Sequence, residues 1–143
     1  MKWLYNKKEI NDIADLPQEA FGFIYQTTHI PSGSKLITDA PVDNKGKGES
    51  FSPTDLLATS MLTCIMTIVA IRADARQIDV SGMSGSIEKT MAANPRRVAK
   101  LEVIVNLPSD MELDDRAWLI TEGCNCPVCV SVSESMDVDV TFQ

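Results

Sequence analysis

The residues of this chain that could do chemistry are its four cysteines, two of which have distinctive positions. Cys64 lies inside a long apolar run, and Cys126 begins the sequence Cys126-Pro127-Val128-Cys129. A thiolate attacks electrophilic oxygen or sulfur, and a second thiol can condense with the resulting sulfenic acid to form a disulfide. We therefore interpret Cys64 and Cys126 as a candidate redox centre. The simpler alternative for Cys64 is core packing, since free cysteine is among the most buried residue types.

The two thiols differ in what the sequence offers to stabilise their thiolates. Cys126 precedes Pro127 at a predicted helix start, where unpaired backbone N–H groups and the helix dipole favour negative charge. Cys64 lies in mid-helix, where burial alone raises the pKa of a thiol. We therefore expect Cys64 to need a cationic partner from elsewhere in the chain.

The predicted helix that carries Cys64 is the strongest structural signal in the sequence. Pro53 fits its first position, with Ser52 before it as a candidate N-cap and Asp55 in the first turn. Apolar residues occupy nearly every side of the run over residues 56–71, which predicts a buried helix. Charge returns at residues 72–77, so we expect the helix to end there.

The remaining pattern predicts strands and shorter helices around this central helix. Strands are expected over residues 21–30, 35–40, 78–91, 98–107 and 136–142, a second helix from Ser109 or Asp110 to Gly123, and a short third helix from Cys126. These elements indicate an α+β fold with antiparallel sheets packed around the central helix. We expect one domain over residues 1–143, with residues 1–20 as an arm. A helix this apolar needs cover on all sides, so we also expect an intertwined homodimer.

Composition restricts the classes of partner. A net charge of −7, from 13 basic and 20 acidic residues, argues against a nucleic-acid-binding surface. The uncharged run over residues 56–71 is short for a membrane span, and residues 1–9 lack the apolar core of a signal peptide. We therefore expect a cytoplasmic protein without nucleic-acid or membrane partners. In that compartment cysteines are more often reactive or metal-binding than joined in structural disulfides.

Three blocks of the sequence resemble the OsmC/Ohr family, the osmotically inducible protein C and organic hydroperoxide resistance proteins. Ser52-Pro53-Thr54-Asp55-Leu56 is similar to the family's Ser-Pro-Thr-Glu-Leu, with Cys64 at the position of its helix cysteine. Cys126-Pro127-Val128-Cys129 is similar to its Cys-Pro-Val-Ser, with a cysteine in place of the serine. Asp39-Ala40-Pro41 resembles the Asp-x-Pro that ends one of its strands. The resemblance covers roughly residues 21–143.

The resemblance implies a thiol-dependent peroxidase that reduces organic hydroperoxides without a metal or organic cofactor. It assigns the attack on the peroxide to Cys64 and the resolution of the sulfenic acid to Cys126, with a dithiol as the reductant. It also implies a homodimer. In the family an arginine upstream of the helix activates the attacking thiol, and the acidic residue that holds this arginine matches Asp55.

The sequence departs from the family at this activating cation. Its first arginine is Arg72, so none precedes Cys64. The cations on the preceding strand and loop are His29, Lys35, Lys45 and Lys47. We take His29 as the candidate replacement, because it lies in the strand region where the family carries its cation. The alternatives are a surface histidine and, for Asp55, simple complementation of the helix dipole.

Three other functions are compatible with the cysteines. Cys126-x-x-Cys129 has the form of a thioredoxin-like motif, but those folds place the motif early in the chain. Cys124, Cys126 and Cys129, together with Cys64 or His29, could supply four zinc ligands, although this spacing is a weak zinc signal. Without the arginine, the protein could also be a non-catalytic one that binds a small apolar ligand beside Cys64.

Overall fold

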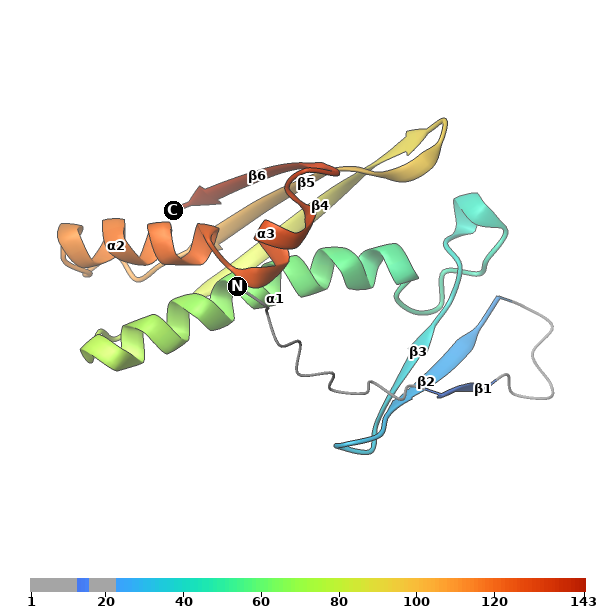
Figure 1. Ribbon diagram of the computed structural model, residues 1–143, viewed down its shortest axis with the longest axis horizontal. Helices are drawn as coiled ribbons and strands as arrows, with labels where there is room; N and C mark the ends of the chain where they lie inside the picture. The colour runs from blue at the N-terminus through green and yellow to red at the C-terminus, as the bar shows by residue number, and fades with distance from the viewer. Residues whose placement is uncertain (1–12, 16–22) are drawn as a thin grey trace, which may run out of the picture. The chain divides into compact units, whose positions relative to one another are not determined.

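The computed structural model describes residues 13–15 and 23–143, which belong to two compact units, residues 1–53 and residues 54–143 (Figure 1). Most of the arm expected over residues 1–20 lies outside the described residues, as do the first two residues of the strand expected over 21–30. The single domain expected over residues 1–143 stays a prediction.

The first unit contains a three-stranded antiparallel sheet in the order β1-β2-β3. Its strands are β1 (Ile13–Asp15), β2 (Tyr25–His29) and β3 (Ser34–Thr38). The β2–β3 connection turns through Gly33, whose φ of +71° is one that residues with a side chain rarely adopt. Strands β2 and β3, which fall on the strands expected over residues 21–30 and 35–40, therefore form a hairpin.

A buried carboxylate fixes the loop that follows β3. Asp39 is 2% exposed, and its Oδ2 accepts the backbone N–H groups of Lys47 and Glu49, each at 3.1 Å. These hydrogen bonds, that of Glu49 foremost, hold the pKa of Asp39 below its usual value against the opposing effect of desolvation. A short 3-10 helix, η1 (Val42–Asn44), lies in the same loop. Asp39 therefore organises the loop from within.

The second unit contains the long helix and a three-stranded sheet in the order β4-β5-β6. Its elements are α1 (Pro53–Arg76), β4 (Ser84–Ala93), β5 (Arg96–Asn106), α2 (Leu113–Cys124), α3 (Pro127–Val132) and β6 (Asp137–Phe142). Helix α1 starts at Pro53 and ends within the expected window, and α3 starts directly after Cys126. The predicted α+β fold class is confirmed.

One strand pairing differs from the expectation of antiparallel sheets. Strand β6 pairs with β5 in parallel, with Val103 opposite Val140, whereas β4 and β5 pair antiparallel. The connection from β5 to β6 runs through α2 and α3, and a crossover of this kind brings a chain back in the same direction. The periodicity of a strand does not report its direction, so the expectation was wrong at β6.

Two element boundaries also differ from the sequence-based expectation. The chain turns at Ser81-Gly82, where the N–H of Met83 donates to the carbonyl of Val80 and Gly82 has a φ of +82°. Strand β4 therefore begins at Ser84 and not at residue 78. Helix α2 begins at Leu113, later than the expected start at Ser109 or Asp110, with two aspartates in its first turn.

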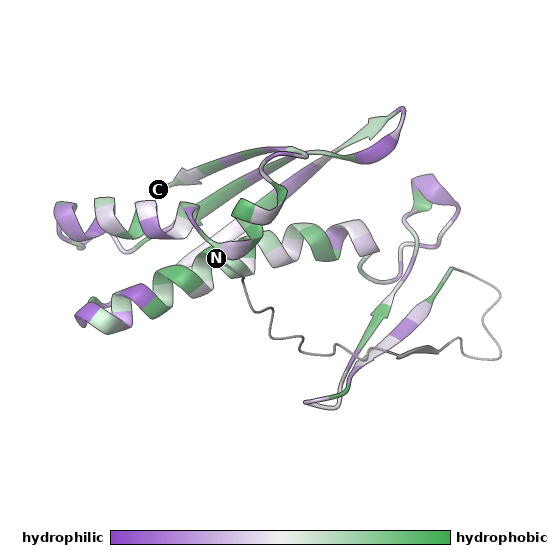
Figure 2. Ribbon diagram, viewed as in Figure 1, coloured by the Kyte–Doolittle hydropathy of each residue, from purple (hydrophilic) through white to green (hydrophobic). Residues whose placement is uncertain are grey.

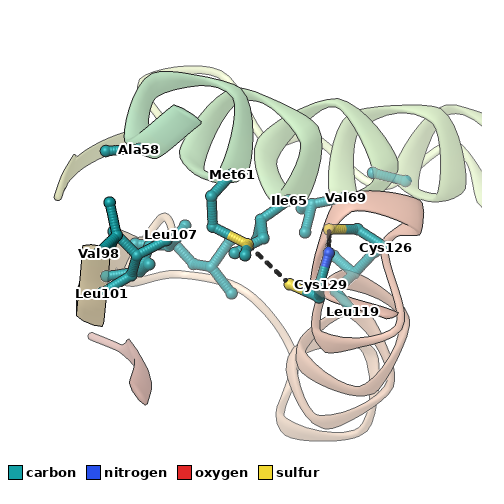
Figure 3. Packing of buried hydrophobic residues seen from close by; sticks show 13 residues of the cluster. Ala58, Met61, Ile65, Val69, Val98, Leu101, Leu107, Leu119, Cys126 and Cys129 are labelled. Atoms are coloured by element: carbon teal, nitrogen blue, oxygen red, sulfur yellow. Dashed lines mark hydrogen bonds between the residues drawn. The ribbon is translucent and has the colours of Figure 1, made fainter. Parts of the chain in front are cut away.

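Helix α1 is buried along one stripe. Its buried residues recur at intervals of three or four, as one face of a helix requires, and are Ala58, Met61, Ile65, Val69 and Ala73. They form one apolar cluster with Leu101 of β5 and Leu119 of α2 (Figure 3). Each of these two leucines is fully buried. The core of the second unit therefore lies between α1, the sheet and α2.

Within one chain helix α1 is covered along one stripe only, so the expectation of a helix buried on nearly every side of a homodimer stays a prediction. Apolar residues run along most of α1 (Figure 2), yet Ile71 remains 57% exposed and Cys64 is half-buried. By length and composition α1 could cross a membrane, but its apolar stripe belongs to the core of the second unit. Sequence hydropathy does not distinguish a residue covered by its own chain from one covered by a partner chain.

Candidate active site

Cys126 caps the short helix α3, as its position before Pro127 predicted. Its backbone is extended (φ −64°, ψ 150°), and its sulfur accepts the backbone N–H of Cys129 at 3.3 Å. The side chain is fully buried. A thiol in this position is held in a fixed orientation, because a backbone hydrogen bond and the surrounding core restrain it.

Cys64 of α1 lies beside Cys126. Burial raises the pKa of the Cys64 thiol, a hydrogen bond from the backbone N–H of Val128 lowers it, and the neighbouring Cys126 thiol raises it. The two thiols, which come from helices far apart in the sequence, therefore interact directly in the folded unit. Both are free, so the site is in its dithiol state.

Cys129 lies one turn beyond Cys126. With Cys64 and Cys126 it forms a group of neighbouring thiols, the cysteine cluster. Its thiol donates to the sulfur of Met61 on α1 at 3.1 Å, and the residue is 7% exposed (Figure 3). Burial, foremost, and the thiols of Cys126, Cys124 and Cys64 raise its pKa to about 12. Cys129 is therefore a neutral thiol at physiological pH.

A pocket opens beside this cluster. Its volume is about 400 Å³, and its lining residues are Cys124, Asn125, Cys129, Val130, Ser133, Val138 and Val140. Cys124 is exposed as a residue. Desolvation of its thiol by the surrounding atoms, and the nearby Cys126 thiol, nevertheless raise its pKa. The described residues that line the pocket thus include two thiols, whereas Cys64 and Cys126 are not among them.

Asp55 lies in the first turn of α1 and forms an ion pair with Lys89 of β4. Lys89 also donates to the hydroxyl of Thr54 at 2.9 Å. Sequence reasoning missed Lys89, because it searched only upstream of Cys64 for a cation. Cys64 follows Asp55 by nine positions in the helix, which corresponds to about 13.5 Å along the axis and half a turn around it. The structure therefore places Asp55 away from direct contact with the thiol.

His29 ends β2 in the first unit. It is exposed, and its Nδ1 forms a hydrogen bond of 2.7 Å with the hydroxyl of Ser32 in the hairpin turn. Its assignment as the cation beside Cys64 stays a prediction. The alternative of a metal site finds no support among residues 23–143, where no three His, Cys, Asp or Glu side chains are grouped to hold a metal ion.

An α+β scaffold that holds a half-buried thiol of a long helix against a capping thiol of a short one defines a protein with a candidate dithiol–disulfide centre. Comparison with known proteins gives its family. The model of the OsmC-like protein family matches residues 46–141. A crystal structure from Psychrobacter arcticus 273-4, of a protein provisionally named an osmotic stress induced and detoxification response protein, is 34% identical. It covers 98% of this chain and 100% of that one, with a TM-score of 0.86.

Two structures of organic hydroperoxide resistance proteins share the fold at lower identity. The protein from Legionella pneumophila is 19% identical, with a TM-score of 0.70 and 99% of each chain covered. The one from Elizabethkingia anophelis is 16% identical, with a TM-score of 0.75 and coverage of 100% of this chain and 99% of that one. No curated protein matches the chain. The family match and the Psychrobacter structure show that this chain belongs to the OsmC-like family, which confirms the resemblance.

Proposed function

We propose that this protein is a thiol-dependent peroxidase that reduces organic hydroperoxides through Cys64 and Cys126. The observation that carries the proposal is the direct interaction of these two thiols, one half-buried and one at the cap of α3. Membership of the OsmC-like family supports a role in hydroperoxide or redox stress. The fold alone would not assign the activity, because one fold hosts many chemistries.

The reaction needs only the two thiols and an external reductant. The Cys64 thiolate attacks one peroxide oxygen, the O–O bond breaks, and the alcohol leaves with a proton. The Cys64 sulfenic acid then condenses with the Cys126 thiol, which forms a disulfide and releases water. A dithiol reductant supplies two electrons and two protons by thiol–disulfide exchange and is itself oxidised to a disulfide.

The surroundings of Cys64 both help and hinder the first step. The N–H of Val128 stabilises the thiolate, whereas burial disfavours it and is the larger effect. A cation would reverse this balance, and His29 is the residue that we propose for that role. The Asp55–Lys89 pair is set back by more than two turns of α1, so we assign it to positioning the start of the helix.

The apolar neighbours of Cys64 favour an alkyl hydroperoxide over hydrogen peroxide. Met61 and Ile68 lie about one turn before and one turn after Cys64 on α1, and Ile68 is only partly buried at the edge of the apolar cluster, as Leu57 is. An alkyl group gains free energy when it covers such surface, and hydrogen peroxide has no group that can do so. The substrate class is therefore an organic hydroperoxide.

We also propose a cytoplasmic homodimer. The exposed apolar side chains of the second unit include Ile71 of α1, Leu113 of α2 and Val130 of α3, and a partner chain would cover such surface. A cytoplasmic location fits the four free thiols, because that compartment keeps thiols reduced.

An anaerobic thiol titration tests the proposed activity. We expect one equivalent of tert-butyl hydroperoxide to remove two of the four titratable thiols within seconds and to yield one equivalent of alcohol. Intact mass should fall by two hydrogens, and metal analysis should find no bound zinc. A reaction with both alkyl and hydrogen peroxide at the rate of a free thiol would contradict the proposal and favour the non-catalytic binding protein.

A further inference from the structure

We propose that Cys129 is a second resolving cysteine. It attacks the Cys64–Cys126 disulfide and forms a Cys126–Cys129 disulfide, which a dithiol reductant then reduces from the pocket beside α3. This inference rests on the proposed function. It adds a catalytic thiol and a reductant site to it. The proposal stands on the placement of Cys129, which contacts the buried Cys126 and also lines the pocket.

The first observation is the geometry of the Cys126-x-x-Cys129 pair. The N–H of Cys129 donates to the Cys126 sulfur at 3.3 Å, so the two residues lie on the same side of the first turn of α3. The thiols also interact with each other directly. A disulfide between them would close a small loop, and neither residue would have to leave its helix.

The second observation concerns access. Cys126 is fully buried, and the described lining of the pocket does not include it. A reductant of about the size of a small dithiol therefore cannot reach the Cys126 sulfur from the pocket. Cys129 is 7% exposed and lines the pocket together with Val130, Val138 and Val140. Transfer of Cys126 from Cys64 to Cys129 would place one sulfur of the disulfide in the lining of the pocket, whereas the half-buried Cys64 is not part of that lining.

The transfer is a balanced exchange without net oxidation. The Cys129 thiol loses its proton, and its thiolate attacks the Cys126 sulfur of the Cys64–Cys126 disulfide. The Cys126–Cys129 bond forms, the Cys64–Cys126 bond breaks, and Cys64 leaves as a thiolate that can meet the next peroxide. A dithiol in the pocket then attacks Cys129, releases Cys126 as a thiol, and closes its own disulfide.

The environment of Cys129 suits a thiol that acts only after oxidation. In the dithiol state its S–H donates to Met61, and the neighbouring Cys126 is one of the groups that raise its pKa. Once Cys126 is held in a disulfide it carries no charge, so its opposition to a Cys129 thiolate is removed. Burial still opposes ionisation, which makes the exchange slower than the resolution by Cys126 that precedes it.

Time-resolved disulfide mapping tests the transfer. The reduced protein is mixed anaerobically with one equivalent of tert-butyl hydroperoxide, quenched with acid at intervals, and digested. We expect a Cys64–Cys126 peptide pair first and a Cys126–Cys129 peptide later, with a free thiol regained at Cys64. In Cys129→Ser the Cys64–Cys126 pair should persist, and its reduction by dithiothreitol should slow at least about tenfold.

The variant Cys124→Ser separates the two pocket thiols. It should still accumulate the Cys126–Cys129 peptide, and a Cys124–Cys126 peptide in the wild type, absent from this variant, would overturn the proposal. A Cys64–Cys126 pair that persists in the wild type, with reduction as fast in Cys129→Ser, would overturn it as well.

A parallel experiment with diamide in place of the hydroperoxide separates this inference from the proposed function, because diamide forms disulfides without peroxide chemistry. Transfer after diamide but no reaction with hydroperoxide would refute the peroxidase and leave the relay standing. Failure of both oxidants to link Cys126 to Cys129 would refute the relay.

Discussion

At the scale of single residues, this protein is defined by how differently four thiols of one chain are placed. Cys124 is exposed, Cys64 is half-buried, and Cys126 and Cys129 are buried. A thiol reacts as its thiolate, so the same side chain is more or less reactive according to burial and hydrogen bonding. The division of labour that we propose follows from these surroundings.

Substitution of the two central thiols should separate attack from resolution. Cys64→Ser should lower the rate of hydroperoxide consumption by about two orders of magnitude or more, because it removes the nucleophile. Cys126→Ser should consume one equivalent and stop, with a sulfenic acid at Cys64 that a dimedone adduct would reveal by mass. Ser131→Ala of the exposed face of α3 is the matched control and should turn over as the wild type does. Full turnover in Cys64→Ser would refute the assignment.

The rate of attack should rise with pH. The pKa of Cys64 is raised from its ordinary value of 9.0, with burial as the main cause, so only a small fraction is thiolate at pH 7. Below the pKa this fraction grows about tenfold for each pH unit, so without an activating cation the rate constant would follow it with no plateau before pH 9. Stopped-flow measurements of the first turnover check this. We expect a plateau below pH 8, because a cation at the place that we propose for His29 would lower the pKa of the thiol. A rise to pH 9 without a plateau would contradict that role of His29.

At the scale of elements, close approach between helices limits the side chains that the active-site region tolerates. Gly123 lies in the last turn of α2, just before the cysteine cluster. A Cβ there would come within 2.9 Å of Val69 on α1 and 3.1 Å of Phe142 on β6. The sequence suggested a helix stop at this glycine, but the helix continues to Cys124, so the glycine serves packing.

Gly123→Ala therefore sets two effects against each other. Alanine favours a helix over glycine by about 1 kcal/mol, whereas overpacking a filled core costs about 1–3 kcal/mol. We expect the cost to be larger, with a net loss of about 1 kcal/mol in the free energy of unfolding, measured with urea. The control Ala117→Gly on the exposed side of α2 should lose about 1 kcal/mol through helix propensity alone. A more stable Gly123→Ala would show that α1 and α2 can move apart.

At the scale of the whole molecule, exposed apolar surface is the main reason to expect self-association. Ile71 of α1 is 57% exposed and Leu113 of α2 is 80% exposed, although both are large apolar residues. We expect sedimentation velocity at micromolar concentration to give twice the mass of the chain. Ile71→Glu should raise the dissociation constant at least about tenfold if its side chain is buried between copies, because a carboxylate loses hydration there. A wild-type monomer of ordinary stability would contradict the homodimer.

The sequence by itself determined the features that depend on neighbouring residues. Pro53 at the start of α1, the return of charge near its end and Cys126-Pro127 at the cap of α3 are local signals, and each was confirmed. The family motifs also pointed to Cys64 and Cys126 as the candidate thiols, and their roles stay a prediction. Backbone conformation within a turn or two is set by such short-range chemistry.

Only the tertiary structure decided which distant residues meet. It made β6 parallel to β5, paired Asp55 with Lys89, and placed Cys129 against Met61 with one edge on a pocket. It also showed which stripe of α1 its own chain covers. These outcomes depend on crossovers and on packing between elements, which hydropathy and spacing along the chain do not encode. Contact between two distant segments is a property of the folded chain, because it depends on how all the other segments pack around them.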